Sequence, residues 1–309
     1  MTDQIWTGFG KGTKNKKGEY IEMYFGPDDI CQGNLLIKPA EGFDLETVRV
    51  SDNEPPSSVP EAYLKLHLLS LRLVKPNETN LDGIFGILHT VAWTSAGPID
   101  SNELNEFLNE KRSKGEYVKV YSVDKFPCLT DYVALNDVRI ADASRVRLGA
   151  YLGPGTTVMH EGSVNFNGGT LGEAMVEGRI AQGVIVGDKS DIGGGASTLG
   201  TLSGGNEVTI SIGESCLLGA NSGLGIPLGD RCTIESGLYV TGSSKVQVIE
   251  NGKVKETVKA MELAHKSDLL FIRNSITGAI ECRDNRNVNE LNEDPVSYTH
   301  LTLPTIYSV

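Results

Sequence analysis

Aliphatic side chains recur at every sixth position through the middle of the chain. They are Ile140, Val146, Leu152, Val158 and Val164, then Val186 and Ile192, then Ile212, Leu218 and Leu224, and, after a four-residue step, Leu228, Ile234, Val240 and Val246. A period of six fits neither an α-helix nor the two-residue alternation of a strand. It is typical of a coil with three flat faces, in which each short strand points one aliphatic side chain inward. Three faces close a turn of about 18 residues, and stacked turns bury a continuous aliphatic rod.

Small residues support this interpretation, because glycine follows many of the aliphatic positions, as in Leu148-Gly149 and Leu218-Gly219. A chain that turns a tight corner has no room there for a bulky side chain. The alternative is a series of β-hairpins, which would show two-residue alternation and turn signals about every 8–12 residues. The region lacks that spacing. We predict two interruptions of the period, at residues 165–179 and 202–207, where loops or distortions would lie on the surface of the coil and where sites tend to be built.

The flanking segments follow other patterns. Residues 1–130 mix strand-like and helix-like stretches, which predicts a separate α/β domain, with strands at 20–25, 47–50, 87–93 and 118–123. One helix is expected to begin after Ser58, which forms a capping box with Glu61. A second is announced by Asp100 with Glu103 and is expected to end at Gly115. Its predicted buried face consists of Leu104, Phe107 and Leu108.

Beyond Val246 the six-residue period ends. Residues 247–294 predict a short β extension, with a hairpin that turns at Asn251-Gly252 and two strands at 268–274 and 278–282. Residues 295–309 change abruptly in composition and are a candidate for a non-native tail, so we assign them no function. The predicted fold is mainly β, with an α/β domain over residues 1–130, a hexapeptide solenoid over 131–246 and the β extension.

Composition and charge narrow the function. The 309-residue chain has a formal net charge of −12, which argues against binding to nucleic acid or to an anionic membrane. An anionic ligand must therefore be held by local lysines and arginines. Five scattered cysteines form no C-x-x-C pair and predict neither a zinc site nor a disulfide framework. Because no stretch approaches 18 apolar residues and the first six residues lack a secretory pattern, we expect a cytoplasmic protein.

Several sequence blocks resemble tetrahydrodipicolinate N-succinyltransferases of the type with the longer N-terminus. The most specific are Met-Val-Glu-Gly-Arg-Ile at 175–180, Gly-Gly-Gly-Ala-Ser at 193–197 and the stretch 217–225, and further blocks lie at 63–70, 123–127, 138–142, 147–152, 154–162, 238–241 and 291–294. The resemblance implies a left-handed β-helix and a homotrimer with sites between neighbouring solenoids. It also implies transfer of succinyl from succinyl-CoA to the amine of L-2-amino-6-oxopimelate, the hydrated form of tetrahydrodipicolinate, in lysine and diaminopimelate synthesis.

The same resemblance assigns residues. Glu177 matches the catalytic glutamate, which acts as a general base toward the amine or attacks the thioester to form an acyl-anhydride. The structural alternative makes Glu177 an ion-pair partner of Arg179. The positions that match acyl-CoA contacts are Arg179, Gly194, Ser197, Ala220, Glu235, Ser236, Lys259, Ile272, Arg273, Asn274 and Ser275. Because the family can carry arginine at position 272, Ile272 predicts a weaker phosphate contact.

A metal site is the least complete part of the resemblance. Glu161 matches a carboxylate that binds Mg²⁺ near the trimer axis, but its companion aspartate falls on Ser144, and Asp142 could substitute only after a register shift. His160 is the only histidine within the hexads, which argues against a zinc site of three histidines. Two other functions stay open: a hexapeptide acyltransferase with another acyl-CoA or acceptor, and a non-catalytic trimeric scaffold.

Overall fold

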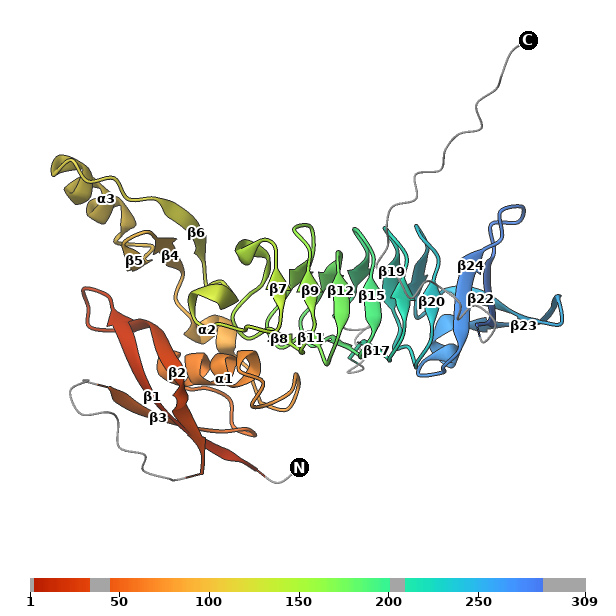
Figure 1. The fold of residues 1–309 in the computed structure, drawn as a ribbon, viewed down its shortest axis with the longest axis horizontal. Coiled ribbons are helices and arrows are strands. Elements are labelled where there is room, and N and C mark those ends of the chain that lie inside the picture. The colour runs from red at the N-terminus through yellow and green to blue at the C-terminus, as the bar shows by residue number, and fades with distance from the viewer. Residues whose placement is uncertain (1–2, 34–44, 201–208, 286–309) are drawn as a thin grey trace, which may run out of the picture.

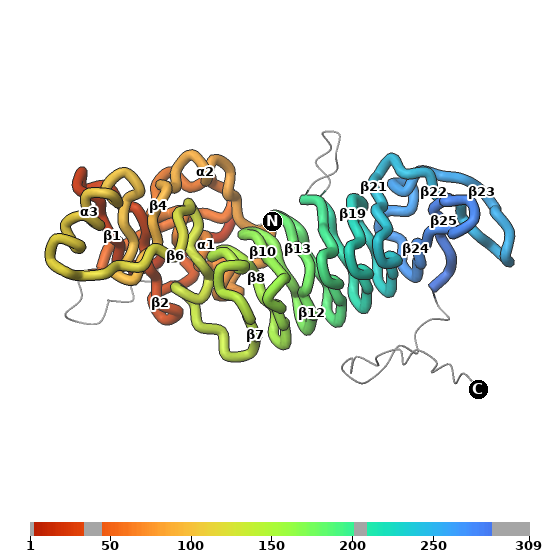
Figure 2. The backbone as a smooth tube through the Cα atoms, turned by 90° about the horizontal axis from the view of Figure 1, so that it is seen from above, coloured from red at the N-terminus to blue at the C-terminus, as the bar shows by residue number. Residues whose placement is uncertain are grey.

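The residues with period six form a three-sided coil along the long axis of the molecule (Figure 1). The structure is a computed structural model that describes residues 3–33, 45–200 and 209–285. We name the three faces of the coil I, II and III in the order in which the chain visits them. Figure 2 shows the turns stacked side by side between an N-terminal unit and a C-terminal group of strands.

Each face is a parallel sheet with its strands in register. Face I contains β7 (Arg139–Ile140), β9 (Thr157–Val158), β12 (Ala174–Val176), β15 (Ser190–Ile192), β18 (Leu217–Leu218) and β20 (Thr233–Ile234). Face II contains β10 (Ser163–Val164), β13 (Arg179–Ile180), β16 (Ser197–Thr198), β19 (Gly223–Gly225) and β21 (Tyr239–Thr241). Face III contains β8 (Tyr151–Leu152), β11 (Gly169–Thr170), β14 (Ile185–Val186) and β17 (Ser211–Ile212). All the predicted aliphatic positions are buried except Ile140, which is half-buried. The parallel β-helix is therefore confirmed.

The interruption predicted at residues 165–179 is a distortion of the coil and not a loop that leaves it, because the corner after β12 has only two residues and the inward Val176 and Ile180 stand four apart instead of six. The coil continues there through β11, β12 and β13, because Thr170 takes an inward position that the pattern reserved for an aliphatic residue. The Thr170 hydroxyl lies 2.6 Å from the hydroxyl of Thr156 and accepts a hydrogen bond from the amide of Gly153, so its burial leaves no unpaired polar atom. The second predicted interruption, at residues 202–207, lies outside the described residues.

The N-terminal unit contains two small antiparallel sheets. The first has the order β2-β1-β3 and consists of β1 (Ile5–Lys14), β2 (Tyr20–Gln32) and β3 (Glu46–Ser51). The second has the order β5-β4-β6 and consists of β4 (Val91–Thr94), β5 (Gly97–Asp100) and β6 (Val120–Asp124). The helices are α1 (Val59–Ser70), α2 (Ile84–Ile87) and α3 (Leu104–Ser113), and a 3₁₀ turn follows at Leu129–Asp131. The strand predicted at 87–93 was wrong in its first half, where α2 ends and a short connection leads to β4.

The two predicted helices have different surroundings. The hydroxyl of Ser58 accepts a hydrogen bond from the amide of Glu61 at the start of α1, as predicted. Helix α3 exists, but its predicted buried face was wrong, because Leu104, Phe107 and Leu108 are only half-buried. The reason lies in its position, since α3 projects from the end of the molecule with the β5-β4-β6 sheet (Figure 1).

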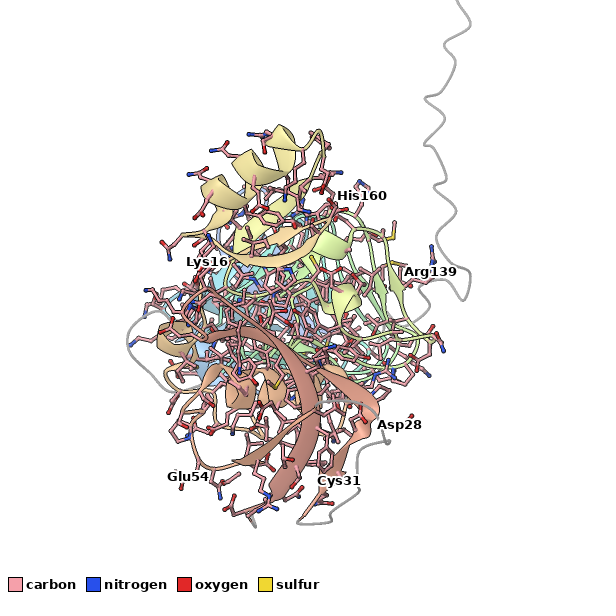
Figure 3. The ribbon with its side chains drawn as sticks, turned by 90° about the vertical axis from the view of Figure 1, so that its left-hand side faces the viewer. Lys16, Asp28, Cys31, Glu54, Arg139 and His160 are labelled. Atoms are coloured by element: carbon pink, nitrogen blue, oxygen red, sulfur yellow. The ribbon has the colours of Figure 1, made fainter. Side chains whose placement is uncertain are left out.

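Helix α1 connects the first sheet to the coil. It packs on the β2-β1-β3 sheet, and at its end the Ser70 hydroxyl accepts a hydrogen bond from the amide of Gly149 and donates one to the carbonyl of Ala150. Farther along, Arg72 forms a two-bonded ion pair with Asp137, with both N···O distances at 2.7 Å. Figure 3 looks along the coil and shows the N-terminal unit in front of the turns.

The C-terminal strands extend face I. They are β22 (Lys245–Glu250), β23 (Lys253–Lys259), β24 (Leu269–Arg273) and β25 (Ile280–Asp284), and a 3₁₀ turn at Ala260–Leu263 lies between β23 and β24. A further 3₁₀ turn, at Ala143–Arg145, lies near the start of the coil. The predicted hairpin at Asn251-Gly252 joins β22 to β23, and β24 pairs in parallel with β20. Within the described ranges, no helix is long and apolar enough to cross a bilayer.

Candidate active site

Glu177 occupies an unusually short corner between faces I and II. Two residues, Glu177 and Gly178, separate β12 from β13, whereas four separate the corresponding strands in the turns before and after. The backbone amides of both residues donate to the carbonyl of Ile192, at 2.8 and 3.1 Å. The short corner therefore fixes the backbone of Glu177, which is half-buried, while the corners of the neighbouring turns are two residues longer.

The next corner leaves space for the Glu177 carboxylate. A Cβ added to Gly194 would lie 3.4 Å from Glu177 Oε2, and no other atom beyond its chain neighbours lies within 4 Å of that position. The carboxylate thus reaches across the glycine, and the surface beside it is open. A side chain larger than hydrogen at position 194 would take up this space.

The predicted cofactor positions form one line along this edge. Backbone hydrogen bonds join the successive corners, from the Gly195 amide to the Glu177 carbonyl, from the Asn221 amide to the Gly194 carbonyl, and from the Gly237 amide to the Ala220 carbonyl. Ser236 lies in the last of these corners, and Glu235 beside it accepts a hydrogen bond from the Arg273 amide at 2.7 Å. The structure therefore brings Glu177, Gly194, Ala220, Glu235, Ser236 and Arg273 together.

The distal positions lie at the C-terminal end of the same edge. Ile272 and Arg273 end β24. The side-chain oxygen of Asn274 accepts hydrogen bonds from the Ile276 and Thr277 amides, so Asn274 shapes the turn that also exposes Ser275.

Lys259 comes from a different element. It ends β23, and the backbone after it bonds to the turn that follows β21, since the Ala260 amide donates to the Ser244 carbonyl. Lys259 is exposed beside the end of face II.

Face II carries a row of outward side chains next to Glu177. Parallel pairing places Arg179 beside Ser163 on one side and beside Ser197 on the other. Arg179 donates a hydrogen bond to the Ser197 hydroxyl at 2.7 Å. Within the described residues it forms no ion pair with Glu177, so the alternative in which Glu177 serves only as an ion-pair partner of Arg179 is not supported.

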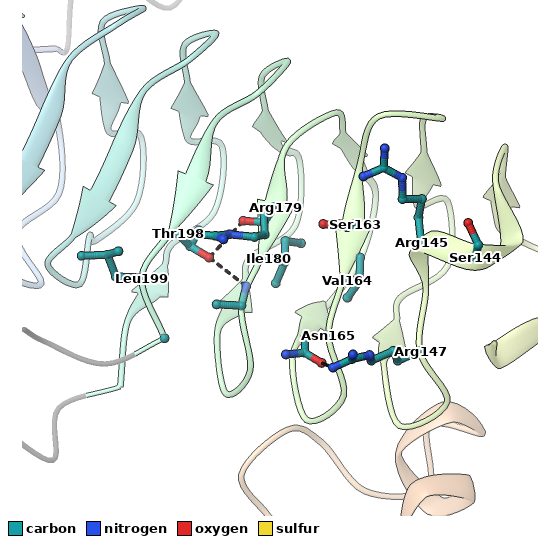
Figure 4. A pocket seen from close by; sticks show the side chains of 12 residues that line it. Ser144, Arg145, Arg147, Ser163, Val164, Asn165, Arg179, Ile180, Thr198 and Leu199 are labelled. Carbon is teal, nitrogen blue, oxygen red and sulfur yellow. Dashed lines mark hydrogen bonds between the residues drawn. The ribbon is translucent and has the colours of Figure 1, made fainter. Parts of the chain in front are cut away.

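A groove of about 470 Å³ crosses face II at this row (Figure 4). Three arginines line it, Arg145, Arg147 and Arg179, and none of the described residues along it is acidic. Arg145 and Arg147 received no role from the sequence. The sequence did indicate that both side chains point outward, because they flank the inward Val146. It did not show which other turns of the coil would lie beside the turn that carries them.

The predicted metal position does not form a metal site within one chain. Glu161 is 68% exposed and lies 3.5 Å from the guanidinium of Arg145. Ser144 donates from both its amide and its hydroxyl to Asp142, and these bonds lower the pKa of the Asp142 carboxyl. Among the described residues, no group of three or more His, Cys, Asp or Glu side chains could hold a metal ion.

Known proteins resemble the chain over most of its length. A family model described as "Tetrahydrodipicolinate N-succinyltransferase middle" matches residues 88–127, and one described as "Hexapeptide repeat of succinyl-transferase" matches residues 209–242. Two relatives are named 2,3,4,5-tetrahydropyridine-2,6-dicarboxylate N-succinyltransferase. The protein from Pseudomonas putida is 56% identical over 267 residues, which cover 86% of this chain and 78% of the relative. The protein from Vibrio cholerae is 60% identical over 251 residues, which cover 81% and 73%.

A solved structure shows the same arrangement of the chain. It is described as a putative 2,3,4,5-tetrahydropyridine-2-carboxylate N-succinyltransferase from Campylobacter jejuni. It superposes with a TM-score of 0.79 at 31% identity, over 91% of this chain and 92% of the other. The similarity therefore includes the N-terminal unit as well as the coil.

Proposed function

The chain belongs to the tetrahydrodipicolinate N-succinyltransferase family, and we propose from this premise that it transfers the succinyl group of succinyl-CoA to the amine of L-2-amino-6-oxopimelate. The reaction belongs to lysine and diaminopimelate synthesis, and the proposal places it in the cytoplasm. The observation that supports it most directly is the carboxylate of Glu177 on a shortened corner, in line with the predicted cofactor positions and two residues before Arg179.

The chemistry follows from this placement. The amine nitrogen attacks the thioester carbonyl, the C–N bond forms, the C–S bond breaks, and CoA leaves as a thiolate that ends protonated. As a general base, Glu177 removes the proton that the amine must lose and passes it toward the thiolate. As a nucleophile, Glu177 first takes the succinyl group as an anhydride, which the amine then attacks. Arg179 lies where its guanidinium can pair with the succinyl carboxylate.

The substrate assignment is tested by CoA release from succinyl-CoA and from acetyl-CoA, with tetrahydrodipicolinate as acceptor. We expect release that depends on the acceptor and strongly prefers succinyl-CoA. Release with both thioesters at equal kcat/KM would instead identify an acyltransferase of another specificity. No release with either would favour a non-catalytic scaffold.

The role of Glu177 is tested by Glu177→Gln, with Glu173→Gln as the control. Glu173 is an exposed glutamate of the same turn. We expect Glu177→Gln to lower kcat by about 10³-fold or more while CoA binding is retained, because one positioned acid–base group contributes roughly 10²–10⁴-fold. Turnover of Glu177→Gln at the level of Glu173→Gln would contradict the assignment. Exchange of labelled CoA into succinyl-CoA without acceptor separates the two mechanisms, since only the anhydride predicts it.

The assembly is also part of the proposal. We expect a homotrimer in which a neighbouring solenoid closes the open side of the face II groove. Light scattering should give three times the mass of the 33.2 kDa chain, and a monomeric mass for the active protein would contradict the trimer.

Three copies of Glu161 around the trimer axis would supply the carboxylates for Mg²⁺. If they do, EDTA should lower the Tm of the wild type and leave the Tm of Glu161→Gln unchanged. Equal Tm values with and without EDTA in the wild type would exclude a stabilising ion.

A further inference from the structure

The groove on face II concentrates positive charge in an acidic protein. The whole chain has a net charge of −12, yet Arg145, Arg147 and Arg179 line this groove and no acidic side chain does so among the described residues. Like-charged guanidinium groups repel one another, so an anion between them is favourable, and the groove lining itself supplies none. Two carboxylates outside the lining supply part of this charge, Glu161 at 3.5 Å from Arg145 and Asp124 at 2.9 Å from Arg147, whereas Arg179 has no ion pair among the described residues.

The register of the coil sets the spacing of these arginines. Val146 pairs with Val164, so Arg145 lies one rung from Ser163, and Ser163 pairs with Arg179. Neighbouring strands are about 4.8 Å apart, so Arg145 and Arg179 start about 10 Å apart on the same outward row. Arg147 follows Arg145 by two residues and lies beside Asn165, in a second row of outward side chains parallel to the first. The three groups therefore form a triangle around the middle of the groove (Figure 4).

Arg147 is held in place by contacts from two parts of the molecule. Its guanidinium donates to Asn165 Oδ1 at 3.0 Å and to Asp124 Oδ2 at 2.9 Å, and its Cζ lies 5.3 Å from the centre of the Phe126 ring. A guanidinium has five N–H donors, so these two bonds leave donors for a ligand. An arginine that is already oriented loses little side-chain entropy when it binds an anion.

The charges of the proposed substrates match this arrangement. The inference rests on the proposed function, in which the succinyl group brings one carboxylate and the acceptor brings two. We propose that Arg145 and Arg147 bind the two carboxylates of the acceptor while Arg179 binds the succinyl carboxylate. The acceptor then lies across the groove with its amine toward the Glu177 corner. The pair of arginines selects an α,ω-dicarboxylate over a monocarboxylate, because an unpaired guanidinium in a closed site is costly.

Calorimetry with pimelate tests this without turnover, since pimelate is an unreactive seven-carbon dicarboxylate. We expect wild-type protein to bind pimelate at least about tenfold more tightly than heptanoate, the monocarboxylate of equal length. Arg145→Gln and Arg147→Gln should each weaken pimelate binding about tenfold or more and leave CoA binding within twofold. Arg139→Gln is the control, because Arg139 is an exposed arginine on face I (Figure 3) and its change removes the same charge.

Steady-state kinetics give the second readout. Each groove variant should raise KM for the acceptor and leave KM for succinyl-CoA unchanged. Arg147→Lys should recover only part of the affinity, since an ammonium lacks the planar fork. Arg145 has one long contact and its replacement should not affect folding, which circular dichroism will check.

Pimelate affinity in both glutamine variants equal to that of Arg139→Gln would overturn the inference. A raised KM for succinyl-CoA alone would overturn it as well. Wild-type protein that binds pimelate through these arginines but transfers no succinyl group would overturn the proposed function and still support a dicarboxylate groove.

Discussion

The coil and helix α1 bury their side chains in opposite ways. Most coil strands turn one side chain inward, and those side chains are aliphatic except at positions such as Thr170 and Thr198. Helix α1 is buried on nearly all sides, because the first sheet covers one side and the coil covers the other. As a result α1 carries titratable groups into the interior, among them Lys65 and His67.

This difference separates what makes the molecule stable from what makes its stability depend on pH. The inward positions of the coil faces named above carry no acidic or basic side chain, and the buried ionisable groups of the coil include the thiols of Cys216 and Cys232. In α1, the Lys65 ammonium donates to the Ser51 carbonyl at 2.7 Å and to the Thr79 hydroxyl at 3.0 Å, and burial lowers its pKa to about 8. Burial also lowers the pKa of His67 to about 4, although its hydrogen bond to the Tyr63 carbonyl opposes that shift.

The largest expected effect is on the coil interior. Leu218→Ala removes a fully buried side chain from face I and should lower the free energy of unfolding by about 3–4 kcal/mol, because neighbouring turns cannot close the cavity. Leu73→Ala, at an exposed leucine after α1, is the matched control and should cost under about 1 kcal/mol. Urea unfolding at neutral pH measures both. Equal losses would mean that the coil interior is not tightly packed.

The next effect should come only from α1. His67 has a folded pKa of about 4 against an ordinary 6.5, so between these values the unfolded chain binds the extra proton. Stability is therefore present above pH 6.5 and is lost as pH falls toward 4, by about 3 kcal/mol from this group. The test compares urea unfolding of the wild type and His67→Gln from pH 7 to 4. The wild type should show the steeper decline, and parallel profiles would contradict a neutral buried His67.

A smaller effect should appear where the two regions meet. Asn77 and Asn167 exchange hydrogen bonds, and the Asn77 side chain also donates to the Gly183 carbonyl. Asn77→Ala should cost about 1–2 kcal/mol and speed amide exchange at Gly183. Asn80→Ala is the control, because the Asn80 side chain bonds only within the N-terminal unit, among the residues described. If Asn80→Ala speeds that exchange equally, the contact does not join the two regions.

The smallest effect is expected on the projecting sheet. Tyr121 on β6 is 62% exposed, so Tyr121→Ser should change the free energy of unfolding by less than about 0.5 kcal/mol. Thermal unfolding at low protein concentration measures it. A larger loss would show that another surface covers β6 in solution.

Much of the fold could be predicted because the coil repeats one local rule. Most inward residues of the three faces followed from the period, and the start of α1 followed from Ser58. Predictions failed where a polar residue took an inward position, as Thr170 did. They also failed where burial depends on distant segments, as for the half-exposed face of α3. The division into domains at residues 130, 246 and 294, the left-handed sense of the coil and the trimer stay predictions.

In the candidate site, too, some residues could be predicted from the sequence and others could not. The resemblance identified Glu177 and Arg179, but Arg145 and Arg147 became candidates only when the turns were stacked. The sequence alone determined which side chains point inward and which point outward, because that depends on a period within one strand. Only the tertiary structure decided which outward side chains are neighbours. Those neighbours come from other turns of the coil. Their positions depend on the number of residues in each corner, which is two at Glu177 and four in the turns before and after it.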